Sequence, residues 1–180
     1  MSYMEDLFHV TRQHVLLAVR EQHEALLVER LSALDAGPVH YRVGGRLPLA
    51  TTGVGLVLLA FAPTAVQNDA IAAYAPEEGR LRQGHDDIRT PADLRRALAE
   101  VRRGDHAFGR QSNPWPVDTV AAPVRNGGEV VAALSVVAPS TGFAEAGYGP
   151  AVRATARAIS RRLAEDGGPT ARPGDAHASP

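Results

Sequence analysis

Two places in the sequence combine residue types that suit the binding of a small anion. The first is Gly53-Val54-Gly55, which follows Thr51 and Thr52 at the expected start of an apolar helix. Glycines there let backbone N–H groups approach a ligand, and the helix dipole favours negative charge at that end. The threonines add hydroxyl donors. The same glycines also suit close packing of a helix on a sheet, so the sequence leaves both interpretations open.

The second place is Ser135, which lies in the apolar run Ala132-Ala133-Leu134-Ser135-Val136-Val137. A hydroxyl with such neighbours is at least half-buried and needs a hydrogen-bond partner. That partner is either nearby backbone or a ligand in a pocket. Ser135 is not in a G-x-S-x-G turn, so we do not expect it to be the nucleophile of a hydrolase.

Other reactive groups are missing or scattered. The chain has no cysteine, and its 19 basic residues are all arginine. This excludes thiol nucleophiles, thiolate metal sites, Schiff-base chemistry and the phosphate-loop lysine. A cation could be held by His85-Asp86-Asp87, but this stretch lies in an expected loop. No nucleophile–base pair or cofactor motif is recognisable, so the sequence predicts no catalysis, no cofactor and no metal site.

Composition indicates one globular domain. The chain has 180 residues, of which 44% are hydrophobic and 22% charged, and a net charge of −1. This balanced charge does not favour non-specific nucleic-acid binding. No secretion signal is recognisable, and the longest apolar run, at 54–63, is shorter than the roughly 20 residues of a membrane span. We therefore expect a cytoplasmic protein without membrane contact.

Helix and strand signals place the two candidate sites in an α+β fold. Strands are expected at 15–19, 25–31, 39–43, 106–110, 119–125 and 130–137, the last two joined by Asn126-Gly127-Gly128. Helices are expected at 3–13, 51–61, 65–74, 90–103 and 150–165, the last beginning at Pro150. Residues 75–89 have the composition of a mobile loop, and residues 166–180 that of a disordered tail. The pattern predicts a mainly antiparallel sheet flanked by helices.

Several segments also occur in a specific order along the chain. They include Gly44-Gly45-Arg46-Leu47-Pro48-Leu49-Ala50-Thr51, Gly55-Leu56-Val57-Leu58-Leu59-Ala60-Phe61, Val131-Ala132-Ala133-Leu134-Ser135-Val136 and the closing Ile159-Ser160-Arg161-Arg162-Leu163. Taken together, over about residues 3–164, the chain resembles the effector-binding domain of the IclR family of bacterial transcription regulators.

The resemblance implies a GAF-like fold with a six-stranded antiparallel sheet over residues 1–165, in which 3–13 would be the end of a linker helix. It implies a small organic effector, often a carboxylic or aromatic acid, and a homodimer or tetramer. It also implies operator DNA binding through a winged helix-turn-helix domain, and no such domain can be placed in this chain.

Carried over position by position, the resemblance implies which residues form the effector cavity. They are Thr52, Gly53 and Val54 at the helix start, Ser135 and Val137 on the last strand, and the apolar walls Val39, Leu47 and Val117.

Two departures from the family pattern favour a more apolar cavity. Leu56 stands where the family often has a lysine, and the stretch 108–116 carries no acidic residue. They also leave a rival interpretation, a dimerisation module that no longer senses a ligand. That module would have its cavity filled by Phe61, Phe108 or Trp115.

Overall fold

The computed structural model describes residues 3–33, 41–74, 85–112, 116–143 and 145–166. Within these ranges six strands form one antiparallel sheet in the order β3-β2-β1-β6-β5-β4. The strands are β1 (His14–Glu21), β2 (Glu24–Leu31), β3 (Arg46–Pro48), β4 (Ala107–Gln111), β5 (Val117–Asn126) and β6 (Glu129–Pro139). The predicted α+β class and six-stranded antiparallel sheet are confirmed.

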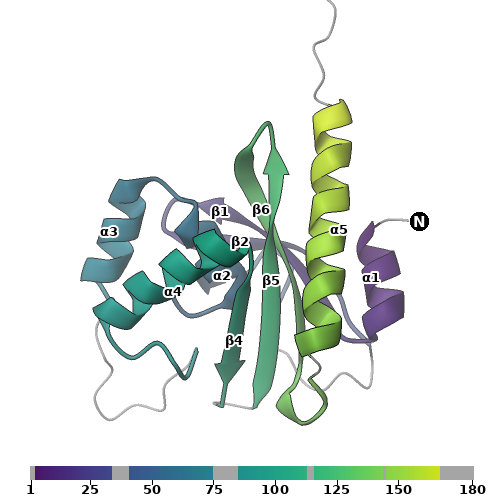
Figure 1. The fold of residues 1–180 in the computed structure, drawn as a ribbon, viewed down its shortest axis with the longest axis horizontal. Helices are drawn as coiled ribbons and strands as arrows, with labels where there is room; N and C mark the ends of the chain where they lie inside the picture. Colours follow the sequence, from purple (N-terminus) through teal and green to yellow (C-terminus); the bar gives the residue numbers. More distant parts are fainter. Residues whose placement is uncertain (1–2, 34–40, 75–84, 113–115, 144, 167–180) are drawn as a thin grey trace, which may run out of the picture.

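Helices cover both faces of this sheet. They are α1 (Tyr3–Thr11), α2 (Gly53–Ala60), α3 (Thr64–Ala72), α4 (Pro91–Gly104) and α5 (Glu145–Asp166), with a short 3-10 turn, η1, at Ser140–Gly142. Helices α2, α3 and α4 lie on one side of the sheet, while α5 and α1 lie on the other (Figure 1). None of the helices in the described ranges is long and apolar enough to span a membrane.

Alternation along the central strands divides the core into two layers. On β5, Val120 packs toward α1 and α5, whereas Ala121 packs toward α2 and α4. On β6, Leu134 and Ala133 are divided in the same way. Because successive strand residues point to opposite faces, Ser135 lies on the α2 face of the sheet.

Helix α2 is the innermost helix, and all eight of its residues are buried. A helix that is apolar on every side has to be enclosed on every side. Its predicted cap is confirmed: the Thr52 hydroxyl accepts a hydrogen bond from the Gly55 N–H at 3.1 Å and donates to the Pro48 carbonyl at 2.9 Å. The helix start is therefore fixed by Thr52 itself.

Replacing Gly55 with alanine is expected to lower the free energy of unfolding by about 1–3 kcal/mol. The added Cβ would lie 2.5 Å from the Leu49 carbonyl oxygen and 2.6 Å from that of Pro48, and backbone atoms cannot rotate away. Urea denaturation measures the loss. The control is Gly127→Asn, because Gly127 has a φ of +58° and open space around it, which asparagine tolerates. Equal losses in the two variants would contradict the packing explanation.

The predicted strand at 39–43 is wrong where the structure describes it. Tyr41 and Arg42 belong to no strand, and Val43 and Gly44 form a turn. This turn, rather than a strand, forms backbone hydrogen bonds with Leu27 of β2. The Leu27 carbonyl accepts from the Gly44 N–H at 2.8 Å, and the Leu27 N–H donates to the Gly45 carbonyl at 3.0 Å. The third strand is the short β3 that follows. Residues 39 and 40 lie outside the described ranges.

Two predicted helix ends are also wrong. Helix α5 begins at Glu145, and Pro150 lies inside it. A proline there removes one intrahelical hydrogen bond, and the packing of the remaining turns against β5 offsets that loss (Figure 1). Helix α1 ends at Thr11 rather than at residue 13, because Arg12 has a φ of +54° and leaves the helix. The predicted hairpin at 126–128 and the cap at Thr90 are confirmed.

Candidate ligand-binding site

A small hollow lies between the start of α2 and the sheet. Seven of the eight predicted site residues line it: Leu47, Thr52, Gly53, Val54, Val117, Ser135 and Val137. The eighth, Val39, lies outside the described ranges. The space open to the centre of a water-sized sphere is about 20 Å³, enough for about one water molecule. The structure brings the predicted residues together, and their role in binding stays a prediction.

Small side chains on neighbouring strands leave this space open. Gly109 of β4 pairs with Thr119 of β5, which pairs with Val137 of β6. In the next row, Ser135 of β6 lies between Ala121 of β5 and Leu16 of β1. The glycine, alanine, serine and threonine in these rows leave volume unfilled below α2, and the larger Val137 and Leu16 line the hollow that remains.

The opening turn of α2 supplies backbone donors to this hollow. Helix geometry leaves the N–H groups of Gly53 and Val54 without intrahelical acceptors, and both residues line the space. Gly53 also packs closely, since a Cβ there would lie 2.8 Å from the Thr119 methyl group. Close packing therefore explains Gly55 fully, whereas Gly53 both packs closely and lines the hollow.

Ser135 is the polar group on the opposite wall. The residue is 1% exposed, and within the described ranges its hydroxyl has no hydrogen-bond partner. Of the two partners that the sequence left open, nearby backbone is therefore not used. A buried hydroxyl without a partner is costly, so the arrangement favours a ligand as its partner.

His85 is a site residue that the sequence analysis missed. It lines the hollow, is 7% exposed, and neither ring nitrogen has a hydrogen-bond partner in the part of the chain described. Its imidazole rests on Gly109, where an added Cβ would overlap the ring. Burial lowers the pKa of His85 below its ordinary value, opposed by the Thr52 backbone and the carboxylates of Asp86 and Asp87. The histidine is therefore neutral near pH 7.

A tight turn carries His85 into this position. The His85 carbonyl accepts a hydrogen bond from the Ile88 N–H at 3.2 Å, and the Tyr74 hydroxyl donates to the Ile88 carbonyl at 2.6 Å. The Asp86 N–H donates to the carbonyl of Arg110 on β4 at 2.8 Å. The predicted loop is thus a fixed turn at 85–89, and residues 75–84 lie outside the described ranges.

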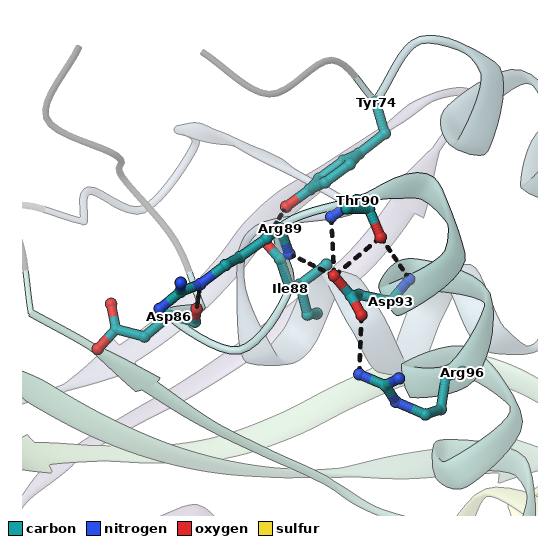
Figure 2. A network of polar contacts seen from close by, with 7 residues as sticks. All are labelled: Tyr74, Asp86, Ile88, Arg89, Thr90, Asp93 and Arg96. Carbon is teal, nitrogen blue, oxygen red and sulfur yellow. Dashed lines mark hydrogen bonds and ion pairs between the residues drawn. The ribbon is translucent and has the colours of Figure 1, made fainter. Parts of the chain in front are cut away.

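Asp93 ties the end of this turn to α4 (Figure 2). Its carboxylate accepts from the N–H groups of Arg89 and Thr90, from the Thr90 hydroxyl and from the Arg96 guanidinium, at 2.8–3.1 Å. The Thr90 hydroxyl, followed by the Arg89 N–H, holds the pKa of Asp93 below its usual range. The His85 turn is consequently anchored to the helix that follows it.

The cation site considered at His85-Asp86-Asp87 is not assembled. The Asp86 carboxylate accepts from the N–H of Ser112 at 3.2 Å and from its hydroxyl at 2.6 Å, while His85 lines the hollow. Across the described residues, no group of three or more His, Asp or Glu side chains is placed to hold a metal ion.

No carboxylate faces the hollow from the lining that the structure describes. The nearest acid in sequence to the acid-free stretch 108–116 is Asp118, and its carboxylate is hydrogen-bonded to other side chains. Its buried carboxylate accepts two hydrogen bonds from the Arg110 guanidinium, each 3.1 Å, and one from the Ser140 hydroxyl at 2.7 Å. The described lining therefore carries donors and apolar groups but no negative charge.

Two of the three residues proposed to fill the cavity lie in other places. Phe61 packs under the Arg125 guanidinium, 4.6 Å from ring centre to Cζ. Phe108 is 36% exposed and stacks obliquely with Phe143. Neither ring lines the hollow, and Trp115 lies outside the described ranges.

Comparison with known proteins identifies relatives over almost the whole chain. The family model described as "Bacterial transcriptional regulator IclR C-terminal" matches residues 1–161. The chain is 29% identical over 141 residues to the HTH-type transcriptional regulator XynR of Escherichia coli, covering 75% of this chain and 52% of XynR. It is 28% identical over 165 residues to the transcriptional repressor AllR of Klebsiella pneumoniae, covering 89% of this chain and 59% of AllR. The chain thus spans between half and three fifths of these relatives.

Solved structures agree with this match. An IclR homolog from Microbacterium hydrocarbonoxydans, complexed with 4-hydroxybenzoate, superposes with a TM-score of 0.80 and 33% identity. That match covers 89% of this chain and 65% of the homolog. The C-terminal domain of the E. coli regulator KdgR gives a TM-score of 0.73 at 22% identity, covering 90% of this chain and 94% of that domain. The KdgR likeness supports the fold alone.

Proposed function

This chain belongs to the IclR family of bacterial transcriptional regulators, as the effector-binding domain, and on that basis we propose that its hollow binds a small organic acid. Its relatives are named as regulators rather than enzymes. In the proposed complex, the carboxylate lies between the amides at the start of α2 and the Ser135 hydroxyl, and the apolar walls hold the body of the acid.

The observation that carries this proposal is the Ser135 hydroxyl, which has no partner among the described residues and lies opposite the opening turn of α2. Ser135, Gly53 and Val54 all line one space, and each offers a hydrogen-bond donor. Backbone amides at a helix start attract anions. Since no acidic side chain is present in the described lining, a carboxylate is favoured over a cation.

The walls and one relative support the class of acid. Leu47, Val117 and Val137 are buried and apolar, which suits an aromatic ring or a short alkyl chain. The Microbacterium homolog is complexed with 4-hydroxybenzoate. A hollow of about 20 Å³ is smaller than such an acid, so binding has to be accompanied by movement of the lining.

That movement is the proposed link to regulation. Binding would favour one arrangement of the subunits in a homodimer or tetramer, and so change operator affinity through a winged helix-turn-helix domain in the whole regulator. The effector's differential affinity for the two arrangements sets the size of that change.

We expect carboxylic acids to raise the melting temperature of the protein, and matched neutral amides not to. The panel is benzoate, 4-hydroxybenzoate and butyrate against benzamide, 4-hydroxybenzamide and butyramide. An acid present at 100 times its Kd adds about 2.7 kcal/mol to the stability of the folded state. Thermal denaturation measures the change in melting temperature, and a subsequent calorimetric titration measures the affinity for each compound. Equal effects of acid and amide would contradict recognition of a carboxylate.

The small size of the hollow favours one rival, a dimerisation module without an effector. It predicts that no acid of the panel changes the melting temperature, while native mass spectrometry shows a stable oligomer. The sensor predicts an oligomer as well, so the two functions are separated by the response of the melting temperature to acid and by any co-purified small molecule in the same spectrum.

A further inference from the structure

The hollow beside α2 holds one side chain able to balance the charge of a buried anion. Of the described residues that line it, only His85 and Tyr41 titrate, and none is arginine. Burial raises the pKa of Tyr41, so its phenol stays neutral near pH 7. A carboxylate is costly to bury unless an opposite charge pairs with it. Within the described lining, that charge can come from the His85 imidazole.

His85 also lies where the hollow meets a second space. Its ring and Gly109 line both the hollow and an outer groove of about 270 Å³ beside α4. Because the ring rests directly on Gly109, it separates the two spaces. An acid that widens the hollow toward the groove therefore contacts or displaces this imidazole.

Two buried polar groups that line this hollow lack partners among the described residues. Neither the His85 ring nitrogens nor the Ser135 hydroxyl makes a hydrogen bond of good geometry there, at 7% and 1% residue exposure, and the Thr52 backbone beside the imidazole only partly offsets the burial that lowers its pKa. Buried polar groups are normally paired. A carboxylate has two oxygens and accepts several hydrogen bonds, so one such group in this hollow has enough acceptor sites for both.

Resting on the function proposed above, we infer that His85 is the charge-pairing residue of the sensor: it takes up one proton from solvent as the acid binds, and pairs as imidazolium with the effector's carboxylate. Neutral imidazole, one proton and the ionised acid combine, and no other bond changes. Ser135 and the α2 amides then orient the carboxylate.

This coupling fixes the sign of the pH dependence. In the free protein, burial lowers the pKa of His85, and a bound carboxylate raises it. At a pH between the pKa of His85 in the free protein and its pKa in the complex, binding takes up as much as one proton. The affinity for the acid therefore falls as pH rises, by at most about tenfold per pH unit. The acids stay ionised throughout, because carboxyl groups titrate near pH 4.

Other ionisable groups lie around His85. They are Asp86 and Asp87 on its own turn, Arg110 of β4 paired with Asp118 of β5, and Asp93, Arg96, Glu100 and His106, which line the outer groove with it. His106 is the one other histidine among them. Its Nδ1 lies 2.8 Å from the Gly104 carbonyl oxygen, which makes His106 a matched control.

The test is calorimetric titration of the whole chain with the three acids at pH 6, 7 and 8, each in two buffers of different ionisation enthalpy. We expect uptake of up to one proton and a loss of affinity toward pH 8. His85→Gln keeps a polar side chain of similar length, and should bind at least tenfold more weakly at pH 6 and lose the pH dependence. His106→Gln should keep it. Nitrogen-15 NMR of labelled histidine should show one imidazole becoming charged when acid is added to wild type.

Each outcome supports or overturns the role of His85. Acid binding to wild type with equal affinity at pH 6 and 8, and without proton uptake, overturns that role and leaves the proposed function standing. So does a His85→Gln variant that retains the pH dependence. If no acid binds wild type at any pH, both proposals fail. If His85→Gln does not fold, the wild-type titrations and the NMR signal still test whether a histidine takes up the proton.

Discussion

Leu59→Ala is expected to lower the free energy of unfolding by about 2–5 kcal/mol, among the largest losses that one substitution in this chain produces. Leu59 is fully buried in α2, and it belongs to the core layer shared by the sheet and α4. Alanine removes three carbon atoms from a site enclosed on all sides, so the surroundings cannot collapse into the space. For a domain of this size, such a loss corresponds to a melting temperature lower by roughly 10 °C.

A matched control separates this packing loss from helix propensity. Val10 lies in α1 and is 76% exposed, so Val10→Ala also places alanine in a helix but removes almost no buried surface. It should change stability by less than about 0.5 kcal/mol. Urea denaturation of both variants gives the two free energies. Comparable losses would show that α2 is not the central element of the core.

The parts of the fold that sequence alone could predict depend on local chemistry. The β5–β6 hairpin follows from Asn126-Gly127-Gly128, since both glycines adopt positive φ. The buried helix α2 follows from its uniform apolar composition and the Thr52 cap. The seven site residues that meet around one hollow were implied by the family resemblance, and the α2 start and the alternation along β6 explain why those on these two elements lie on the same side of the sheet.

The parts that sequence could not predict depend on contacts between distant segments. His85 matters because its ring rests on Gly109, and nothing near residue 85 reveals the pairing of β4 with β5 that presents this glycine. The failed strand at 39–43 has a similar origin. Alternating apolar residues predict a half-buried strand, but of the described residues in this stretch only Tyr41 is partly buried, where it lines the hollow, while Val43 is 57% exposed. The alternation therefore reflected neither strand pairing nor the burial of one face.

Ser135→Ala is expected to have opposite effects on stability and on binding. The Ser135 hydroxyl is buried and, among the described residues, has no partner. Removing such a group relieves a desolvation cost of about 1–3 kcal/mol, so the free protein should become more stable, by about 1 kcal/mol. In the complex, the same change removes a hydrogen bond to a charged oxygen, of about 1.5–3 kcal/mol. Acid affinity should therefore fall by roughly 10- to 150-fold.

Ser140→Ala is the control for the opposite changes in stability and acid affinity expected of Ser135→Ala. The Ser140 hydroxyl donates to the buried carboxylate of Asp118 at 2.7 Å, so its removal should destabilise the protein by about 1–3 kcal/mol and leave acid binding unchanged. Truncating a serine that stabilises the fold lowers the stability of the protein, whereas truncating one that binds a ligand lowers only the affinity for that ligand. Thermal denaturation with and without benzoate measures both quantities in both variants. A loss of stability in Ser135→Ala would assign this hydroxyl to the fold and remove it from the site, because a group satisfied by the protein has no need of an effector.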